Sequence, residues 1–399
     1  MVSRGVVPVA RGTGGAELVA FALSENLAAC GDEVVLISDV DQALIDDAPA
    51  GLRVVHVDTH RGWGRVVKLV PFVFPRWLLQ HLVGNVRAAR LASQVLASDD
   101  RGFDVVHLHG ALATILLRHR VRLAGYDVPL VYTEHDSTPW SCHYRGRLEG
   151  AVRRVIYRQI NLRACRRASA VVINFPSFAR ELADRSGMPE SHFVTVRNGV
   201  RAESGSSGPT QLVVVPTVDR YLLFVGSLIK RKGPDVLLRA LTSVDLGCVF
   251  IGDGPMRASL EHLAAREGLS ERVVFLGAID PSEVQRYYGG AEALVLPSVS
   301  EGVPLVAVEA LRAGTPVVAS NLEGIASVVR DRDNGLLVEP GDAVSLAGAL
   351  SLIESDERLM RSLRQGATRS ARNVLSWSAV AGHLRVVYED YCPAGALSA

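Results

Sequence analysis

The chain has 399 residues, of which 48% are hydrophobic and 21% are charged, and its formal net charge is +1. This length exceeds what one hydrophobic core usually supports, so two domains of roughly 200 residues are expected. The near-neutral charge argues against a nucleic-acid-binding protein, which would carry a strongly basic surface.

Five scattered cysteines without a CxxC pair argue against a disulfide framework or a zinc site. No apolar run reaches the roughly 20 residues of a membrane-spanning helix, and no signal peptide opens the chain. These features predict a cytoplasmic protein. Within residues 1–17, only residues 1–3 precede what reads as a loop, whereas an α/β domain would begin with a full strand. A truncated first strand or a translation start upstream is therefore expected.

Short apolar segments rich in β-branched residues alternate with helical patterns along the first half of the chain. The predicted strands are residues 33–39, 52–58, 103–110, 129–136 and 168–175. Helical patterns cover residues 16–31, which end at Gly31, and residues 152–168. Continuous apolar strands that alternate with amphipathic helices predict a parallel sheet covered on both faces.

The pattern breaks at residues 196–220, whose Gly, Ser and Pro content predicts a flexible connection. It restarts with predicted strands at residues 221–227, 248–254, 272–278, 292–298, 316–320 and 335–340. We therefore predict an α/β protein with two doubly wound, Rossmann-like parallel-sheet domains that face each other across a cleft. The domains are residues 1–200 and 201–374, and a C-terminal helix at 375–391 is expected to pack back onto the first. Ligands of such sheets bind beyond the carboxyl ends of the strands.

The stretch SVSEGVPLVAVEALRAGTPVVAS, residues 298–320, places two glutamates around a predicted helix start. Glu301 lies in the loop after a strand, and Glu309 lies inside an otherwise apolar helical pattern. Pro304 is expected in the first turn, where its missing N–H costs nothing. The backbone amides around Val303 and Leu305 would form a helix N-terminus that attracts anions.

The spacing alone allows two interpretations of these glutamates. In one, both carboxylates line a ligand site, because about 100° per residue places Glu309 on a face of the helix next to that of Glu301. In the other, Glu301 caps the helix and Glu309 pairs with Arg312.

This stretch resembles the E-x7-E signature of retaining GT-B glycosyltransferases of the family 4 type, which use nucleotide-sugar donors. Other segments match the recurring blocks of that family in order, so the resemblance covers nearly the whole chain. They are GGAE (14–17), DVVHLHG (104–110), RNGV (197–200), FVGSLIKRKGPDVLLRAL (224–241), IGDGPMRASLE (251–261) and VVFLGAI (273–279).

The resemblance implies a role for each residue on the donor side. Glu301 is expected at the sugar hydroxyls and the anomeric centre, and Glu309 at the ribose hydroxyls. Lys232 and the segment Gly302, Val303, Pro304 and Leu305, with its free backbone amides, are expected at the diphosphate. Glycosyl transfer develops positive charge at the anomeric carbon and negative charge on the departing diphosphate, so this arrangement of charges suits the reaction. A carboxylate also gives vicinal hydroxyls a strong acceptor.

In the first domain, the resemblance implicates Gly14, Gly15 and His135. The two glycines open a helix and would let backbone amides approach a phosphate closely. His135, at the end of a predicted strand, corresponds to a histidine that donates a hydrogen bond to the reacting sugar; an exposed loop histidine is the alternative. His107 and His109 alternate along a strand and face the same side. A metal pair is conceivable there, but lining of the cleft or the core is favoured.

Two departures affect the charges expected at the donor. Many relatives have arginine where this chain has Ser227. Lys230 or Arg231 could replace it, although a solvated charge cluster is favoured for at least one of the two. The triplets DVD (39–41) and DRD (331–333) suggest a metal-dependent GT-A enzyme. Both lie beside turns and are interpreted as solvated loops, since GT-B enzymes of this type need neither a metal nor another cofactor.

The acceptor is less constrained. Residues 60–82 interleave basic and aromatic side chains, which suits a peripheral membrane contact with a lipid-linked acceptor or, equally, a lid over a soluble one. The polar segment 133–150 could meet an acceptor rich in amines or hydroxyls, or could be solvated.

The function expected from the resemblance is transfer of a sugar from a nucleoside diphosphate, most often UDP, to a hydroxyl of a small-molecule or lipid-linked acceptor. Such a reaction is expected either in natural-product biosynthesis or in the biosynthesis of cell-envelope glycans. A catalytically silent protein that binds nucleotide sugars is the alternative. A Rossmann oxidoreductase is a more distant one, because IGDGPM (251–256) lacks the full glycine-rich fingerprint.

Overall fold

The computed structural model describes residues 4–8, 15–38, 50–56, 76–98, 102–123, 128–135, 147–199, 220–371 and 376–391. The chain divides into two compact units. The first comprises residues 1–140, 151–201 and 375–399, and the second comprises residues 141–150 and 202–374. The sequence places the main boundary at 200/201, one residue away, and assigns 141–150 to the first domain.

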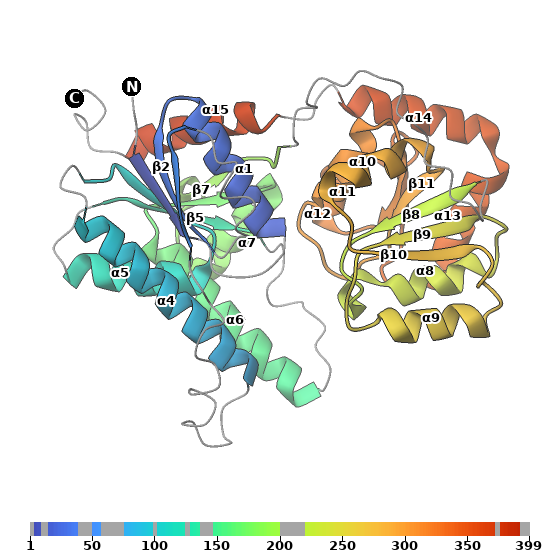
Figure 1. Ribbon diagram of the computed structural model, residues 1–399, viewed down its shortest axis with the longest axis horizontal. Helices are drawn as coiled ribbons and strands as arrows, with labels where there is room; N and C mark the ends of the chain where they lie inside the picture. Colours follow the sequence, from blue (N-terminus) through green and yellow to red (C-terminus); the bar gives the residue numbers. More distant parts are fainter. Residues whose placement is uncertain are drawn as a thin grey trace. The chain divides into compact units, whose positions relative to one another are not determined.

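The first unit contains a parallel sheet with the strand order β3-β2-β1-β4-β5-β6-β7 in the part of the chain that is described (Figure 1). Its strands are β1 (Arg4–Pro8), β2 (Glu33–Ser38), β3 (Leu52–His56), β4 (Val105–Leu108), β5 (Leu130–Glu134), β6 (Ala170–Ile173) and β7 (Phe193–Thr195). The connections cross the sheet in opposite directions on either side of the β1–β4 pair, which makes this pair the topological switch point.

Helices connect these strands and cover the sheet. They are α1 (Gly15–Ala29), α4 (Arg76–Ser98), α5 (Ala111–Leu123), α6 (Arg147–Arg167), α7 (Pro176–Ser186), the 3-10 helix η1 (Glu190–His192) and α15 (Trp377–Tyr391). Helices α4 and α5 pack on one face of the sheet, where buried side chains from β2 and β4 such as Ile37 and Leu108 meet them. The C-terminal helix α15 contacts α1.

Residues 4–8, which the sequence pattern reads as part of a loop, form a strand. Strand β1 runs through Arg4–Pro8 and pairs in parallel with both β2 and β4, so it lies at the centre of the sheet. Gly5 and Pro8 suggest a loop by local preference, yet hydrogen bonding to a strand on each side outweighs that preference. Strand β7 escapes the sequence pattern because it has only three residues, Phe193–Thr195.

The second unit contains a parallel sheet with the strand order β10-β9-β8-β11-β12-β13 among the described residues. Its strands are β8 (Tyr221–Val225), β9 (Gly247–Ile251), β10 (Val273–Gly277), β11 (Ala293–Leu296), β12 (Val317–Ser320) and β13 (Gly335–Val338). Its helices are η2 (Lys230–Lys232), α8 (Pro234–Leu241), α9 (Arg257–Arg266), α10 (Pro281–Gly290), α11 (Leu305–Arg312), α12 (Glu323–Ala326), α13 (Ala343–Ser355) and α14 (Glu357–Ala371).

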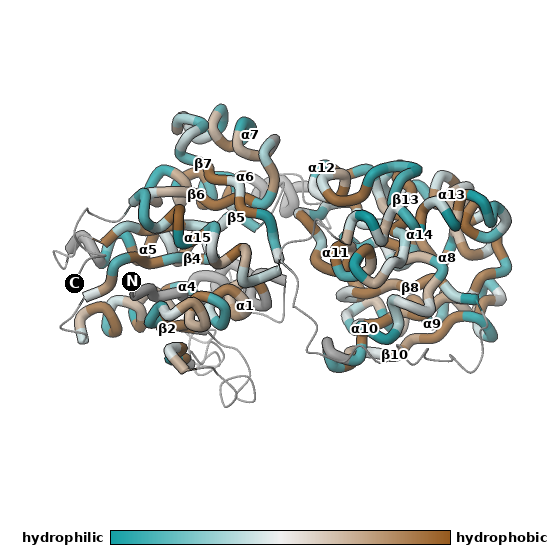
Figure 2. The backbone as a smooth tube through the Cα atoms, turned by 90° about the horizontal axis from the view of Figure 1, so that it is seen from above, coloured by the Kyte–Doolittle hydropathy of each residue, from teal (hydrophilic) through white to brown (hydrophobic). Residues whose placement is uncertain are grey.

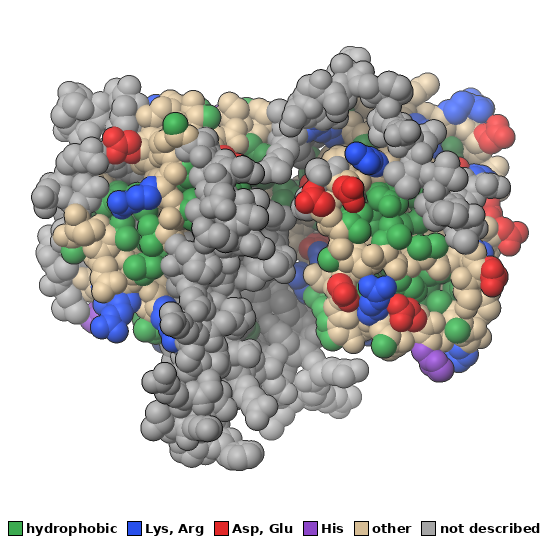
Figure 3. Space-filling model, in the orientation of Figure 1, with side chains coloured by type: hydrophobic (Ala, Val, Ile, Leu, Met, Phe, Trp, Pro, Cys, Tyr) green, Lys and Arg blue, Asp and Glu red, His purple; other side chains and the backbone are tan. Residues whose placement is uncertain are grey.

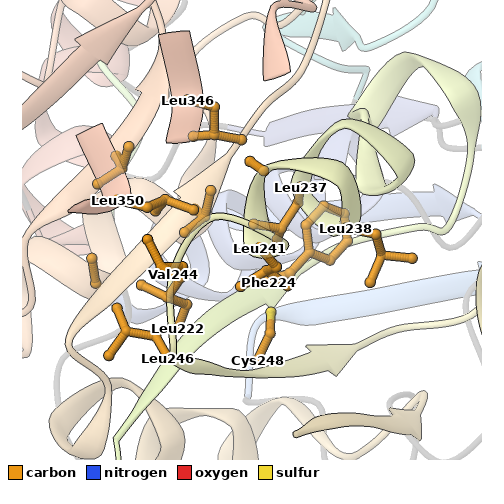
Figure 4. Packing of buried hydrophobic residues seen from close by; sticks show 14 of the residues in the cluster. Leu222, Phe224, Leu237, Leu238, Leu241, Val244, Leu246, Cys248, Leu346 and Leu350 are labelled. Carbon is orange, nitrogen blue, oxygen red and sulfur yellow. The ribbon is translucent and has the colours of Figure 1, made fainter. Parts of the chain in front are cut away.

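Helices cover both faces of the second sheet, as the continuous apolar strands predict. Successive residues of β8 alternate between two cores: Leu222 and Phe224 join the core under α8 and α13, while Leu223 joins the core under α10 and α11. Figure 4 shows the first of these cores, with leucines of α8 packed over β8. Burial of one such side chain stabilises the fold by about 1.5–3 kcal/mol.

The surface of the second unit carries both polar and hydrophobic residues (Figure 3). The helices around its sheet carry both apolar and polar residues (Figure 2). Acidic and basic side chains are interspersed on the face of this unit shown in Figure 3. Among the described residues, no helix is long and apolar enough to cross a membrane.

Candidate functional site

The second unit has its topological switch point between β8 and β11, which are neighbours in the sheet but far apart in the chain. Two loops leave the carboxyl ends of these strands. The loop after β8 contains Ser227 and η2, and the loop after β11 contains Glu301 and leads into α11. In open α/β sheets the ligand binds where such loops diverge, so the second unit has its candidate site here.

Glu301 binds cations from the other loop. Its side chain is 8% exposed, and its Oε1 accepts hydrogen bonds from the Lys232 Nζ and from the Ser298 Oγ, the latter at 3.1 Å. The Arg231 guanidinium lies 3.8 Å from the Glu301 Oε2. The Glu301 carboxylate is therefore paired and oriented from both sides of the switch point.

Gly233 permits this close approach of the two loops. It adopts a left-handed backbone conformation with φ +67°, and a Cβ there would lie 2.1 Å from the Pro297 carbonyl oxygen. Only glycine fits without moving the backbone. The chain after β8 thus packs directly on the chain after β11, and Val299 N–H donates to the Arg231 carbonyl at 2.9 Å.

The N-terminus of α11 lies next to Glu301 in the chain. Helix α11 begins at Leu305, so Pro304 occupies the N-cap position rather than the expected first turn, and its side chain makes no capping hydrogen bond. The N-cap residue is therefore Pro304 and not Glu301. Gly302, Val303 and Leu305 are partly buried, and Pro304 is buried. Backbone amides of a helix N-terminus suit an anionic group.

Glu309 lies in the second turn of α11, where it is partly buried. Its Oε2 accepts a hydrogen bond from the Tyr288 hydroxyl of α10 at 2.8 Å. Burial raises the pKa of Glu309, while the Tyr288 hydrogen bond and the charge of Arg312 act in the opposite direction. A carboxylate held in this way accepts hydrogen bonds strongly when it is ionised.

Lys230 and Arg231, the two candidates to replace an arginine at Ser227, have different partners in the structure. The Lys230 ammonium pairs with the buried Asp235 at 2.5 Å, and its side chain is 68% exposed. Arg231 instead donates to the Ser300 carbonyl at 3.2 Å and lies beside Glu301. Arg231 therefore has the position of a second cation next to Lys232.

In the first unit, His135 lies at the end of β5 in contact with His109. The His109 Nδ1 and the His135 Nε2 are 2.8 Å apart, and their rings stack. His109 also stacks on His107, which is hydrogen-bonded to Thr133 and to Tyr388 of α15, both at 2.6 Å. His107 and His109 are buried. Their partners are aromatic and hydroxyl groups of the first unit, as a position in the core predicts.

Acidification is expected to destabilise the protein through this histidine cluster. Burial lowers the pKa of His107 to about 3 and that of His135 to about 4. The pKa of each returns to about 6.5 on unfolding, so the unfolded chain binds more protons between about pH 4 and pH 6.5. The free energy of unfolding should fall by about 1.4 kcal/mol per pH unit for each histidine as the pH drops through this window. Urea unfolding at a series of pH values measures it.

A matched pair of variants separates this effect from other titrations. His107→Asn removes one buried histidine and should make the dependence on pH shallower. His119→Gln removes an exposed one and should leave the dependence as it is. An unfolding free energy that stays constant through the window would contradict the expectation.

Several expectations fall outside the described residues. Gly14, the triplet DVD (39–41) and most of the linker 196–220 lie there, as do residues 60–75 and 136–146 of the two expected acceptor segments. Gly15 is the first residue of α1. The triplet DRD (331–333) is among the described residues, and its two aspartates make contacts near their own loop. Asp331 accepts a hydrogen bond from the Leu337 N–H, and Asp333 pairs with Arg330 and Arg369.

The sequence analysis missed the residues that orient the glutamates and His135. Ser298 precedes Glu301 by three residues and could have been suspected as its donor. Tyr288 and His109 could not, because each meets its partner only through the packing of separate elements, α10 on α11 and β4 beside β5.

Comparisons with known proteins agree with this architecture. Residues 13–204 match the family described as Glycosyltransferase Family 4, and residues 213–370 match Glycosyl transferases group 1. The phosphatidyl-myo-inositol mannosyltransferase of Mycobacterium leprae is 34% identical over 310 residues, which are 74% of this chain and 76% of the relative. A D-inositol 3-phosphate glycosyltransferase of Corynebacterium aurimucosum is 31% identical over 321 residues, which are 72% of each chain.

Solved structures show the same fold at lower identity. Sucrose-phosphate synthase from Thermosynechococcus elongatus has a TM-score of 0.75 and 22% identity, over 98% of this chain and 99% of its own. The HepE protein of Anabaena in complex with UDP-glucose has a TM-score of 0.76 and 18% identity, over 98% of this chain and all of its own. The two parallel-sheet units, the matched segments and these likenesses agree. The chain belongs to the glycosyltransferases of group 1 and family 4 type, and it has their GT-B fold.

Proposed function

We propose that this glycosyltransferase moves a sugar from a UDP-sugar to a hydroxyl group of its acceptor, with retention of the anomeric configuration and without a metal. The pairing of Glu301 with Lys232 at the switch point of the second unit carries the proposal. It brings a carboxylate for the sugar and a cation for the diphosphate together at the expected place of a ligand.

The charges of the site suit the separation of charge in the reaction. As the bond to the diphosphate breaks, positive charge develops at the anomeric carbon and negative charge on the leaving group. In the proposal Glu301 faces the sugar, while Lys232, Arg231 and the N-terminus of α11 stabilise the leaving diphosphate. These cationic groups would supply the positive charge that a divalent metal supplies in other glycosyltransferases.

UDP is the proposed nucleotide because HepE, which shares the fold, binds UDP and UDP-glucose. Glu309 would accept hydrogen bonds from the ribose hydroxyls. The names of the relatives include phosphatidyl-myo-inositol and D-inositol 3-phosphate. We therefore propose an acceptor that carries a polyhydroxylated ring, as a small molecule or linked to a lipid.

A thermal-shift screen of UDP-, GDP-, ADP- and dTDP-sugars tests the proposed donor. A ligand present at about 100 times its Kd stabilises the folded state by about 2.7 kcal/mol, so a UDP-sugar should raise the melting temperature by several degrees. Stabilisation by another nucleotide alone would overturn the choice of UDP. Binding without release of UDP in the presence of acceptors would instead indicate a silent binding protein.

Replacement of Glu309 by glutamine is expected to weaken UDP binding about tenfold, because a neutral amide accepts hydrogen bonds less strongly than a carboxylate. The same change should stabilise the ligand-free protein at neutral pH. Burial raises the pKa of Glu309 above its value in the unfolded chain, so its ionisation costs folding free energy once the pH exceeds the ordinary carboxyl range. Glutamine avoids this cost and still accepts from Tyr288.

Calorimetric titration with UDP and urea unfolding at neutral pH measure the two effects. Glu357→Gln, at an exposed position of α14, is the matched control and should change neither quantity. Unchanged UDP affinity in Glu309→Gln would remove Glu309 from the donor site.

A further inference from the structure

Three histidine rings stack in the first unit at the carboxyl ends of β4 and β5, with His107 inside β4 and His109 and His135 just after the two strands. The ring centroids of His107 and His109 are 4.6 Å apart, and those of His109 and His135 are 5.0 Å apart. A hydrogen bond of 2.8 Å joins the His109 Nδ1 to the His135 Nε2. The far end of the stack is fixed by Tyr388 and Thr133, which bond to the two ring nitrogens of His107.

The His109–His135 hydrogen bond can run in either of two directions. Burial lowers the pKa of both rings, so each is a neutral imidazole with one N–H near neutral pH. If His109 donates, then His135 accepts at Nε2 and carries its own proton on Nδ1. If His135 donates from Nε2, then His109 must carry its proton on Nε2, and His135 has a bare Nδ1.

The second nitrogen of His109 distinguishes these directions. His109 is 8% exposed, and its Nε2 is buried without a hydrogen-bond partner among the described residues. Orphaned buried N–H groups are rarer in proteins than under-satisfied buried acceptors. The His109 proton is therefore placed on Nδ1, where it is donated to His135.

We propose that His109 is a positioning residue that fixes His135 in the Nδ1–H tautomer. The remaining nitrogen of His135, whose side chain is partly exposed, then presents an N–H donor and not a bare acceptor. An N–H at this position matches a hydroxyl or ring oxygen of the sugar. This inference rests on the role at the donor sugar that the sequence resemblance implies for His135, although the tautomer itself can be measured without turnover.

The tautomer is measured on the intact protein by nitrogen-15 NMR after selective labelling of histidine. Neutral tautomers are distinguished by the chemical shifts of Nδ1 and Nε2, and His135 is assigned by the signal that His135→Gln removes. The expected result near neutral pH is a protonated Nδ1 and an unprotonated Nε2. A protonated Nε2, or a doubly protonated ring, would overturn the proposal.

Two isosteric variants test the consequence for the reaction. The amide of His109→Asn can donate in place of the Nδ1–H, whereas the carboxylate of His109→Asp can only accept. With UDP-glucose as the probe, His109→Asn should keep kcat for UDP release within about threefold and keep the Nδ1–H tautomer. His109→Asp should lower kcat about 30-fold or more, change KM little and move the His135 proton to Nε2.

The outcomes separate positioning from mere packing. Equal losses in both variants, with the His135 tautomer unchanged, would show that His109 only fills space and would overturn the proposal. If His109→Asp does not fold, the tautomer of the wild-type protein decides alone. If UDP-glucose is not turned over at all, the proposed donor fails, while the NMR result still decides whether His109 sets the proton on His135.

Discussion

Replacement of Glu301 by glutamine is expected to lower kcat for sugar transfer by about 10²–10³-fold while it leaves the affinity for UDP within about threefold. Glu301 is buried and oriented by Lys232 and Ser298, so its charge is fixed before the reaction begins. A fixed charge near the anomeric carbon stabilises the transition state more than the ground state, so its loss should appear in kcat. Glutamine keeps the shape and an acceptor for Ser298.

Initial rates of UDP release, with the donor that the thermal-shift screen selects, give kcat and KM, and calorimetry gives the UDP affinity. Glu261→Gln on α9 removes a carboxylate that pairs only on the surface of its own helix, and it should leave the kinetics unchanged. Full activity of Glu301→Gln would exclude Glu301 from the chemistry. Loss of UDP affinity without loss of kcat would assign it to binding alone.

Replacement of Lys232 by alanine is expected to weaken UDP binding by about 10–150-fold, which is the loss of one charge-assisted hydrogen bond to phosphate. The same variant should be less stable by about 1–3 kcal/mol, because it leaves the buried Glu301 without its closest cation. Calorimetric titration with UDP and urea unfolding separate these two losses.

A double variant distinguishes ligand binding from stability. Lys232→Ala combined with Glu301→Gln removes both charges of the pair and should recover most of the stability while UDP affinity stays low. Lys230→Ala is the matched control for a lysine in the same short helix. Its ammonium pairs with Asp235, so the UDP affinity should change by less than about twofold. Recovery of affinity in the double variant would show that Lys232 acts only as a structural partner of Glu301.

Arg231 provides the third comparison within η2. Since Arg231 lies beside Glu301 and Lys230 does not, Arg231→Ala should weaken UDP binding about tenfold, and the two variants should therefore differ. If both variants change the UDP affinity equally, Arg231 does not take the role of the arginine that many relatives have at the position of Ser227.

Periodicity predicted most of the fold. Continuous apolar segments such as 221–227 and 292–298 became inner strands, because a strand covered on both faces needs no polar residue until its end. The exceptions were β1 and β7. Gly5 and Pro8 disfavour a strand locally, and only the pairing of β1 with β2 and β4 overrides them. Three residues are too few for β7 to show a period.

The sequence by itself determined the residue types of the proposed donor site and their order, since Lys232, Glu301 and Glu309 stand in motifs whose spacing can be recognised in one dimension. Tertiary structure alone decided their partners. Lys232 meets Glu301 because Gly233 lets the β8 loop pack on Pro297, Glu309 meets Tyr288 because α10 lies beside α11, and His135 meets His109 because β5 pairs with β4. Local motifs show which side chains are present. The contacts that set their charge and proton positions join residues 21 to 69 positions apart, and only the folded sheet brings them together.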